Sequence, residues 1–371
     1  MPTSSHRSPA FRLILTIETT CDETAAAVVT DELAVLGSAI ASQDALHQRF
    51  GGVVPEIASR AHVEAILPVI DEALARAGVK LTDLNAVAVA NTPGLAGSLL
   101  VGLTAAKTLA MALGVPLVAV NHLQAHIYAA RLAAGKDIFP CVGLIVSGGH
   151  SSLYRCAGPL DFTQLGGTID DAAGEAFDKV AQMLGLPYPG GPAIEATARD
   201  GNPKAYKFPR AFLRDDDRLD FSFSGLKTAV RYAICPPAAR EGARGRPAVS
   251  NAEPESGGRE ELQLDRETVA NLAASFQAAV VDCLVGKSLA ALTKTGMRRL
   301  CVGGGVAANG ALKARLEAES RRRHFELHIP PPSLCTDNAV MGAIAIERLK
   351  AGLVEGLDLD AYPAIGTAPQ H

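Results

Sequence analysis

LILTIETTCDETAAAVV, residues 13–29, is the stretch from which the fold is predicted. Its apolar run Leu13–Ile17 enters a polar turn, ETTCDET, and leaves it through a second apolar run, Ala25–Val29. Residues 141–154 repeat this order, with the run CVGLIV, the turn SGGHSS and a second run. Each copy predicts a β-hairpin whose turn of small polar residues has the size of a phosphate-binding loop. The repeat indicates a duplicated domain, and two unrelated hairpins are the alternative.

Away from the hairpins, apolar runs alternate with helical patterns. Runs that end in glycine or in polar turns predict further buried strands at Ala86–Ala90, Leu117–Val120 and Leu300–Val302. Strands that alternate with helices are typical of an α/β architecture. The predicted helices are Pro55–Ala77, Ser98–Leu113, His122–Ala134, Ala172–Leu184 and Glu267–Leu292.

Composition bounds the class of protein. Hydrophobic residues make up 48% of the 371 residues, which is enough to bury the cores of about two domains. The formal net charge of −4 does not favour nucleic-acid binding, so an RNA substrate would need a local basic patch or a partner. The seven cysteines lack CxxC spacing, which argues against a disulfide framework or a cysteine zinc site and favours the cytoplasm.

We expect neither a membrane segment nor a secretory signal. No apolar run approaches the roughly 20 residues that span a bilayer. The first ten residues, MPTSSHRSPA, lack the apolar core of a signal peptide.

Two histidines with helical spacing form the strongest local signal. His122 and His126 are four residues apart and would share one helix face, within reach of one cation. A HExxH protease helix carries a glutamate after its first histidine; Leu123 stands there, so the hydrolytic base is missing. Asp337, in LCTDNA, is the candidate third ligand, and two imidazoles with one carboxylate suit iron(II) or zinc. A pair of surface or partly buried histidines is the alternative.

Other motifs are rich in small or acidic residues. Residues 146–152 (VSGGHSS) and 303–305 (GGG) would let backbone N–H groups approach an anion, or they form ordinary turns. Residues 170–179 (DDAAGEAFDK) are acidic at a predicted helix start, where acids also complement the helix dipole. PGGP at 189–192 is typical of a rigid turn. FSFSGLK at 221–227 would either contact a nucleotide or RNA, or pack in the core.

Together these segments resemble the bacterial type of the universal tRNA N6-adenosine threonylcarbamoyltransferase family, formerly labelled O-sialoglycoprotein endopeptidase. The resemblance covers nearly the whole chain, apart from the N-terminal extension, residues 236–263 and the tail. The motifs that carry it follow in order from residue 17 to residue 339: IETTCDET, GGVVPEIASRAH, NTPGLAGSLLVG, NHLQAHIYAA, VSGGHSSLY, GTIDDAAGEAFDKVA, YPGGP, FSFSGLKT, GGGVAANGALK and CTDNA.

The resemblance implies the fold shared by actin, Hsp70 and sugar kinases (the ASKHA fold), an α/β architecture of two RNase-H-like domains with a nucleotide cleft between them. We expect the N-terminal domain at residues 11–135 and the C-terminal domain at 136–336. The latter contains a disordered insertion at 236–263, where aromatic and large apolar side chains are nearly absent. A terminal helix at 337–351 would return to the cleft, and an irregular tail would follow at 352–371.

The resemblance also implies an acyltransferase reaction. The threonylcarbamoyl group would pass from threonylcarbamoyl-AMP to the N6 amine of the adenosine adjacent to the anticodon, in tRNAs that read ANN codons. The family implies two protein partners, a paralogue with the same fold and a P-loop ATPase, and a cytoplasmic location.

Functional positions carry over where the motifs match. His122, His126 and Asp337 match the ligands of one divalent metal, iron(II) in preference to zinc. Asp22 and Glu23 match acids implicated in activity, and which of them acts as the base stays open. Glu195 stands where the family often has aspartate. The remaining matches are substrate-binding positions: Ile145, Val146, Ser147, Gly148, Gly149, Asp178, Gly191, Glu195 and Asn309.

Three other functions compete with this reading. HxxxH suggests a metallopeptidase, against which the missing glutamate argues. A nucleotide-dependent chaperone or kinase of the same fold would not need two histidines. A catalytically silent scaffold resembling the family's short paralogues would lack the histidine pair, which is present here.

Overall fold

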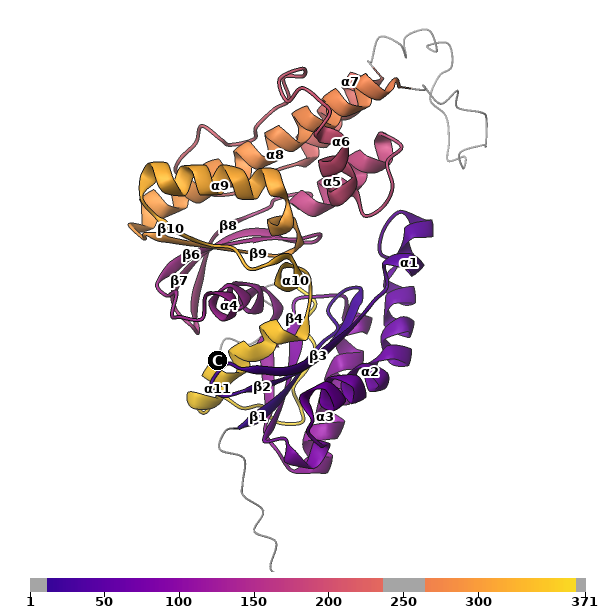
Figure 1. Cartoon of the computed structure of the whole chain (residues 1–371), viewed down its shortest axis with the longest axis vertical. Coiled ribbons are helices and arrows are strands. Elements are labelled where there is room, and N and C mark those ends of the chain that lie inside the picture. Colours follow the sequence, from indigo (N-terminus) through magenta and orange to yellow (C-terminus); the bar gives the residue numbers. More distant parts are fainter. Residues whose placement is uncertain (1–11, 236–263, 365–371) are drawn as a thin grey trace, which may run out of the picture.

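The computed structural model describes residues 12–235 and 264–364. The predicted insertion at 236–263 lies outside these ranges, as do residues 365–371 of the tail. The described chain forms two five-stranded sheets, one above the other in Figure 1.

The N-terminal sheet has the strand order β3-β2-β1-β4-β5. β1 is antiparallel to β2, and β2 to β3, whereas β1 is parallel to β4, and β4 to β5. Every residue of β1 and β4 is buried, as expected for central strands that are covered on both faces. The strands are β1 (Leu13–Glu18), β2 (Glu23–Thr30), β3 (Val35–Ser42), β4 (Ala86–Thr92) and β5 (Leu117–Asn121).

The C-terminal sheet repeats this plan, with the order β10-β9-β6-β7-β8. Here β6, β7 and β8 form the antiparallel part, and β9 and β10 continue in parallel from β6. The central strand of each copy therefore pairs with a hairpin partner on one side and a parallel strand on the other. The predicted duplication is confirmed. The strands are β6 (Cys141–Val146), β7 (Ser151–Gly158), β8 (Asp161–Gly167), β9 (Arg299–Gly303) and β10 (Glu326–His328).

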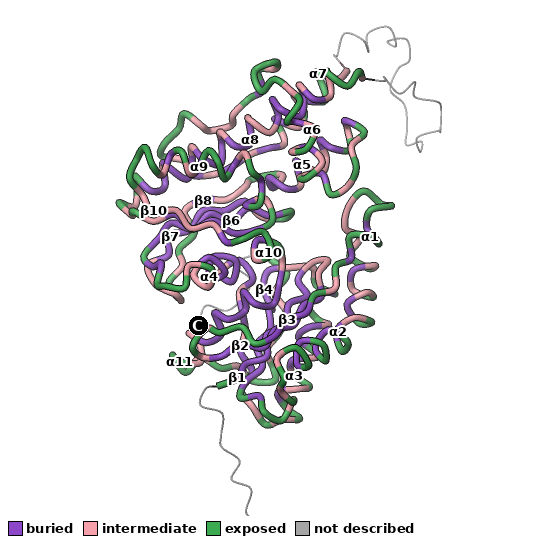
Figure 2. Tube along the Cα trace, in the orientation of Figure 1, coloured by how far each residue is buried: buried purple, intermediate pink, exposed green. Residues whose placement is uncertain are grey.

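Helices lie outside each sheet and between the two sheets, so the molecule has five layers (Figure 1). One apolar core joins the N-terminal sheet to α2 and α3, and another joins the C-terminal sheet to α5, α7, α8 and α9. Figure 2 shows the inner strands as largely buried, whereas the edge strands β3, β8 and β10 are half-buried or exposed along most of their length. The helices are α1 (Asp44–His47), α2 (Pro55–Ala77), α3 (Ala96–Leu113), α4 (His122–Ala134), α5 (Ala173–Met183), α6 (Gly190–Ala198), α7 (Ser224–Ile234), α8 (Arg266–Thr295), α9 (Gly310–Arg323), α10 (Pro332–Cys335) and α11 (Ala345–Lys350), with 3₁₀ turns η1 (Gln48–Phe50), η2 (Leu81–Asp83), η4 (Gly305–Ala308) and η5 (Ala339–Ile344).

The middle layer consists of α4 and the segment that contains η5 and α11 (Figure 1). Its core combines Ile14 and Val118 of the N-terminal sheet with Ile145 and Cys301 of the C-terminal sheet, and Tyr128 of α4 lies among them. The two sheets thus share one apolar core, which places α4 beside the carboxyl ends of both.

The predicted helix at 337–351 is divided. Its first part, η5, is a 3₁₀ helix, and regular α-helix begins only at Ala345. The Thr16 hydroxyl donates a 2.6 Å hydrogen bond to the Ala339 carbonyl oxygen and so occupies an acceptor that an α-helix would use. Gly342 lies against β1, since a Cβ there would be 2.9 Å from the Thr16 Cβ. Contacts with β1 therefore override the helical pattern of this segment.

Two helices, α3 and α8, are long and apolar enough to cross a membrane by length and composition. Core helices of globular proteins reach the same length and composition, so the expectation of no membrane segment stays a prediction. In α8, 67% of the 18-residue apolar stretch is buried within the fold, and this burial explains why the helix is apolar. In α3 that share is only 33%.

Candidate active site

A cavity of about 840 Å³ lies between the two halves of the molecule. This volume is within the range of small-molecule sites, which is roughly 300–1,000 Å³. The turn between β1 and β2, the turn between β6 and β7, and the amino ends of α5 and α6 contribute to its wall. The predicted site residues among those that line it are Asp22, Glu23, His122, Ser147, Gly148, Gly149, Asp178, Gly191, Glu195, Asn309 and Asp337.

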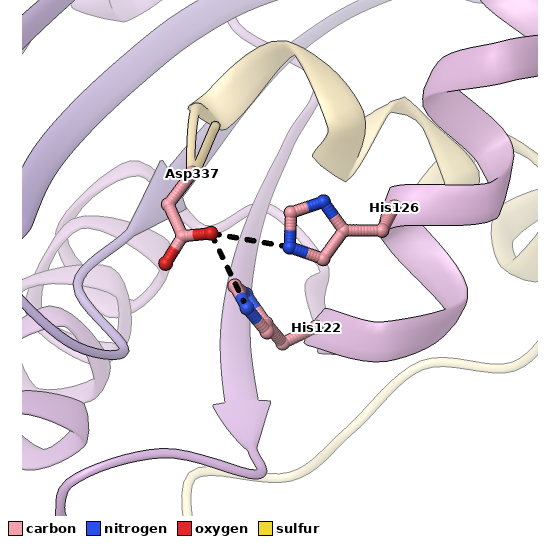
Figure 3. A group of neighbouring side chains, drawn as sticks. All are labelled: His122, His126 and Asp337. Atoms are coloured by element: carbon pink, nitrogen blue, oxygen red, sulfur yellow. Dashed lines mark ion pairs between the residues drawn. The ribbon is translucent and has the colours of Figure 1, made fainter. Parts of the chain in front are cut away.

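His122, His126 and Asp337 come together at one side of this cavity (Figure 3). The Nε2 atoms of His122 and His126 lie 3.6 and 3.1 Å from the same carboxylate oxygen, Oδ1 of Asp337. Both histidines come from the first two turns of α4, because Asn121 caps this helix by accepting hydrogen bonds from the N–H groups of Leu123 and Gln124. The third side chain arrives from the loop before η5.

The buried state of this cluster fits a cation. His126 is fully buried, its Nδ1 makes no hydrogen bond to a described residue, and its Nε2 has only the 3.1 Å contact with the Asp337 carboxylate. A cation held between this Nε2 and the carboxylate would satisfy both buried groups. Burial alone would lower the pKa of His122, but the carboxylates of Asp337 and Glu18 outweigh it and raise that pKa to about 9. The site is thus strongly attractive to positive charge.

Glu18 is a candidate site residue that sequence reasoning missed. It is only 3% exposed, and its Oε2 lies 3.2 Å from Nδ1 of His122, which also lies 3.2 Å from the Thr20 hydroxyl. A carboxylate that accepts the Nδ1–H proton leaves the Nε2 lone pair facing Asp337, as metal-ligating histidines require. The available signal was a glutamate at the end of an otherwise apolar buried strand.

The turn between β6 and β7 is built to present amide groups. The carbonyl oxygens of Ser147 and Gly148 accept hydrogen bonds of 3.1 Å from the N–H groups of Gly174 and Glu175, at the start of α5. Within residues 12–235 and 264–364, the N–H groups of Gly148 and Gly149 have no acceptor. They line the cavity, so this turn can hold an anion. Ile145 and Val146, also predicted to bind substrate, are fully buried in β6 and do not line the cavity.

Gly174 makes the contact between this turn and α5 possible. A Cβ atom at Gly174 would be 2.6 Å from the Ser147 carbonyl oxygen and 2.7 Å from the Gly148 Cα. Any larger residue would therefore push the turn and the helix apart.

The other predicted substrate residues lie on the C-terminal side of the cavity. Asp178 accepts a 2.7 Å hydrogen bond from the N–H of Gly190, and burial raises the pKa of Asp178 to about 6. Asn309 caps α9 by accepting from the N–H of Leu312, and its amide donates to Gln277. Glu195 accepts from the N–H of Gly310 at 3.2 Å. These side chains are held in place by the backbone around them.

The glycine run at 303–305 serves packing more than ligand approach. A Cβ at Gly303 would be 2.6 Å from the His126 carbonyl oxygen, and one at Gly304 would be 2.4 Å from that of Val146. Gly304 also has a φ of 91°, which favours glycine. Only Gly305 of the three lines the cavity.

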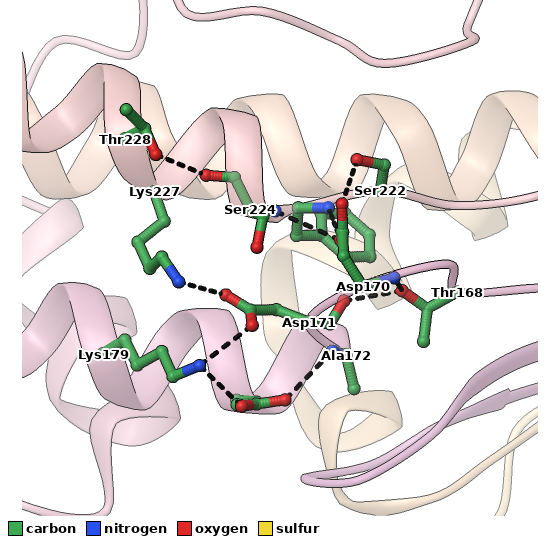
Figure 4. Close-up of polar contacts among 11 residues, drawn as sticks. Thr168, Asp170, Asp171, Ala172, Lys179, Ser222, Ser224, Lys227 and Thr228 are labelled. Carbon is green, nitrogen blue, oxygen red and sulfur yellow. Dashed lines mark hydrogen bonds and ion pairs between the residues drawn. The ribbon is translucent and has the colours of Figure 1, made fainter.

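The acidic motif at 170–179 and the motif at 221–227 hold each other (Figure 4). Asp170 accepts hydrogen bonds from the N–H groups of Phe223 and Ser224, at the start of α7. Asp171 pairs with Lys227 at 2.7 Å and with Lys179 at 2.9 Å. Because Phe223 is fully buried, core packing describes the aromatic part of the second motif.

Asp22 and Glu23 face the cavity together with Asp44, which the sequence did not indicate. Carboxylate oxygens of all three lie within 4.8 Å of one another. Burial, together with the charges of Asp337 and Asp22, raises the pKa of Glu23 far above its usual value. The protonated form of Glu23 is therefore favoured more than that of an isolated glutamate.

Comparisons with known proteins indicate the family of the chain. A family model described as tRNA N6-adenosine threonylcarbamoyltransferase matches residues 34–344. A protein of that name from Rhodopirellula baltica is 53% identical over 367 residues, which cover 96% of this chain and 98% of the relative. Another, from Moorella thermoacetica, is 51% identical over 352 residues, with 94% and 96% covered.

A solved structure resembles the fold at low sequence identity. Full-length HypF in the phosphate- and nucleotide-bound form matches with a TM-score of 0.57 and 14% identity, over 92% of this chain and 56% of that chain. At this identity the likeness concerns the fold alone. Together with the family match and the duplicated sheets, it confirms the predicted α/β fold of actin, Hsp70 and sugar kinases.

Proposed function

The chain belongs to the tRNA N6-adenosine threonylcarbamoyltransferase family, and we propose that its cavity binds threonylcarbamoyl-AMP as the donor. The acceptor is the N6 amine of the adenosine adjacent to the anticodon, in tRNAs that read ANN codons. One observation carries this proposal: a His-His-Asp cluster and a turn whose amide groups have no acceptor among the described residues border the same cavity. Adenylate and carbamoyl oxygens are the kinds of group that such a pair would hold.

His122, His126 and Asp337 would hold one divalent cation, iron(II) in preference to zinc. Two imidazoles and one carboxylate leave coordination positions open, which suits either ion. When bound, such a cation supplies positive charge and Lewis acidity beside the donor. Glu18 would orient His122 toward it through the 3.2 Å contact.

The chain's own groups account for donor binding. The N–H groups of Gly148 and Gly149 would bind the donor phosphate. Asp178 and Glu195 would accept hydrogen bonds from the ribose hydroxyls, and Asn309 lies beside them in the cavity wall. These contacts fix the adenylate on the C-terminal side, which leaves the acyl group near Asp22 and Glu23.

The transfer step forms one bond and breaks another. The adenosine N6 attacks the carbamoyl carbon, the bond from that carbon to the phosphate oxygen breaks, and AMP leaves with the electron pair. The amine then gives up a proton. Because the raised pKa of Glu23 favours its protonated form, Asp22 would accept the amine proton while Glu23 donates a hydrogen bond to the acyl group.

Exposed apolar side chains on α2 and α3 would form the surface for the paralogous partner. Val63 and Leu67 of α2 are 63% and 65% exposed, and Met111 of α3 is 64% exposed. A second helix pair packed here would remove them from water, whereas the C-terminal sheet has no comparable face among its described helices. The P-loop ATPase would join this complex, which we place in the cytoplasm. Exposed Lys204, Lys207 and Arg214 would contact tRNA.

The proposal is tested by metal content and transfer measured on one preparation. His122→Ala and His126→Ala should each lose bound metal, measured by mass spectrometry, and should lose modified adenosine in digested tRNA. His324→Ala, which changes an exposed histidine at the end of α9, is the matched control and should retain both. Full transfer by a metal-free His126→Ala protein would refute the assignment.

The rival activities have specific readouts. A metallopeptidase would cleave a glycoprotein in a chelator-sensitive way, and a kinase would transfer a phosphoryl group from ATP. Neither is favoured, because Leu123 replaces the hydrolytic glutamate and the relatives at 53% and 51% identity carry the transferase name.

A further inference from the structure

The end of the described chain returns to the cavity. After α11, Glu355 donates its backbone N–H to the Leu117 carbonyl oxygen at 2.8 Å, and its side chain pairs with Arg348 at 2.7 Å. The chain then continues along the N-terminal half as far as Pro363, which lines the cavity. We call residues 360–363 the C-terminal strap. The sequence predicted only an irregular tail here.

The strap is hydrogen-bonded to the end of β4 and to the loop between β4 and α3. The N–H of Tyr362 donates to the Asn91 carbonyl oxygen at 2.9 Å, and the Asn91 amide donates to the Asp360 carbonyl oxygen at 3.0 Å. The N–H of Gly94 donates to the Pro363 carbonyl oxygen at 3.2 Å. Asn91 is only 4% exposed, so these bonds are shielded from water.

The same loop also touches the acidic turn of the site. The N–H of Leu95 donates to the Thr20 carbonyl oxygen at 2.8 Å. A Cβ at Gly94 would lie 2.7 Å from that oxygen, so the two backbones pack directly. The loop is therefore fixed between the strap on one side and the Thr20 turn on the other.

This arrangement gives the cavity an apolar corner on its N-terminal side, made by Pro93, Leu95 and Pro363. The proposed adenylate contacts all lie across the cavity, on the C-terminal side. A donor bound there would extend its acyl group toward the corner. Threonine differs from serine by one methyl group, and rigid apolar surfaces such as proline rings recognise a methyl group by excluding water from it.

We propose that the C-terminal strap, with Pro93 and Leu95, forms the wall that contacts the threonyl methyl group and selects threonylcarbamoyl over serylcarbamoyl donors. This assignment rests on the proposed function. It makes Pro363 a specificity-determining residue and Asn91 a positioning residue that holds the strap in place.

The test compares two donors, threonylcarbamoyl-AMP and serylcarbamoyl-AMP, by the ratio of their kcat/KM values. In the unaltered protein this ratio should be at least about 10, the usual effect of one methyl group in an apolar pocket. Asn91→Ala, which frees the strap, should reduce the ratio to near one. Pro363→Gly, which removes only the ring, should reduce it by a smaller factor. AMP affinity should not change in either variant.

A loss of folded protein would slow both donors equally and leave the ratio unchanged, so the ratio separates selectivity from stability. Pro203→Gly, at an exposed proline away from the cavity, is the matched control and should keep the full ratio. If Asn91→Ala does not fold, Pro363→Gly decides the question. An unaltered ratio in Pro363→Gly would overturn the strap proposal, whereas absence of transfer from threonylcarbamoyl-AMP in the unaltered protein would instead overturn the proposed function.

Discussion

The β1–β2 and β6–β7 turns face one cavity from two copies of the same topology, but they carry opposite chemistry. The first turn brings the carboxyl groups of Asp22 and Glu23, and the second brings the N–H groups of Gly148 and Gly149, which have no acceptor in the described part of the chain. The strands before the two turns also differ in the charge of their last residue, since β1 ends at Glu18 and β6 ends at Val146. The duplicated frame sets where the turns lie, and residue type decides which charge each one handles.

The largest expected effect comes from the acidic turn. Asp22→Asn should slow transfer by about 100- to 10,000-fold, because the amine proton loses its acceptor. Glu23→Gln should cost less, since the raised pKa of Glu23 favours the protonated carboxyl group, which a glutamine amide resembles as a hydrogen-bond donor. Single-turnover transfer with saturating donor measures both. A slower rate for Glu23→Gln than for Asp22→Asn would exchange the two roles.

A substitution at Gly149 would give the β6–β7 turn a negative charge like that of the β1–β2 turn. Gly149 has open space around its Cβ position, so Gly149→Glu should fit and place a carboxylate beside the donor phosphate. Like charges at this distance cost several kcal/mol, which predicts AMP binding weakened by about 100-fold. Gly149→Gln has the same size without the charge and should bind AMP nearly as well as the unaltered protein. Equal losses in the two variants, measured by calorimetry, would show that shape matters and charge does not.

The smallest expected effect comes from Glu18, the residue at the end of β1. Glu18→Gln should weaken metal binding by about 10- to 100-fold, because His122 loses the carboxylate that orients it. Glu326→Gln, at a partly exposed ion pair on β10, should leave metal affinity unchanged. Competition with a chelator measures the affinity, and thermal unfolding of the metal-free proteins checks that both are folded. Unchanged affinity in Glu18→Gln would remove Glu18 from the site.

Much of the fold could be predicted because its elements have strong local patterns. The helix at Pro55–Ala77 was predicted to the residue, with a proline at its first turn and Gly78 just after its end. Cys141–Val146 was equally clear as a fully apolar run. The division of the terminal helix at Ala345 could not be predicted, since it depends on the Thr16 hydroxyl, which is distant in sequence.

The candidate site, like the fold, could be predicted from the sequence only in part. The meeting of His122, His126 and Asp337 followed from helical spacing and from a matched motif. Asp44 and the C-terminal strap had no sequence signal, because their place in the wall depends on which loops the tertiary fold brings to the cavity. The glycine run at Gly303 and Gly304 is usually a sign that a ligand approaches the backbone. In this structure the two glycines instead allow β9 to pack against α4 and β6.

The shared middle layer has a consequence for motion. Both histidines lie on α4 and Asp337 precedes η5, so all three candidate ligands are carried by the one layer that packs against both sheets. If the halves swing relative to each other, this layer is the pivot, and displacement grows with distance from it. The cation pocket would keep its shape through such a swing, while the gap between the carboxyl-bearing and amide-bearing turns would open and close around the donor.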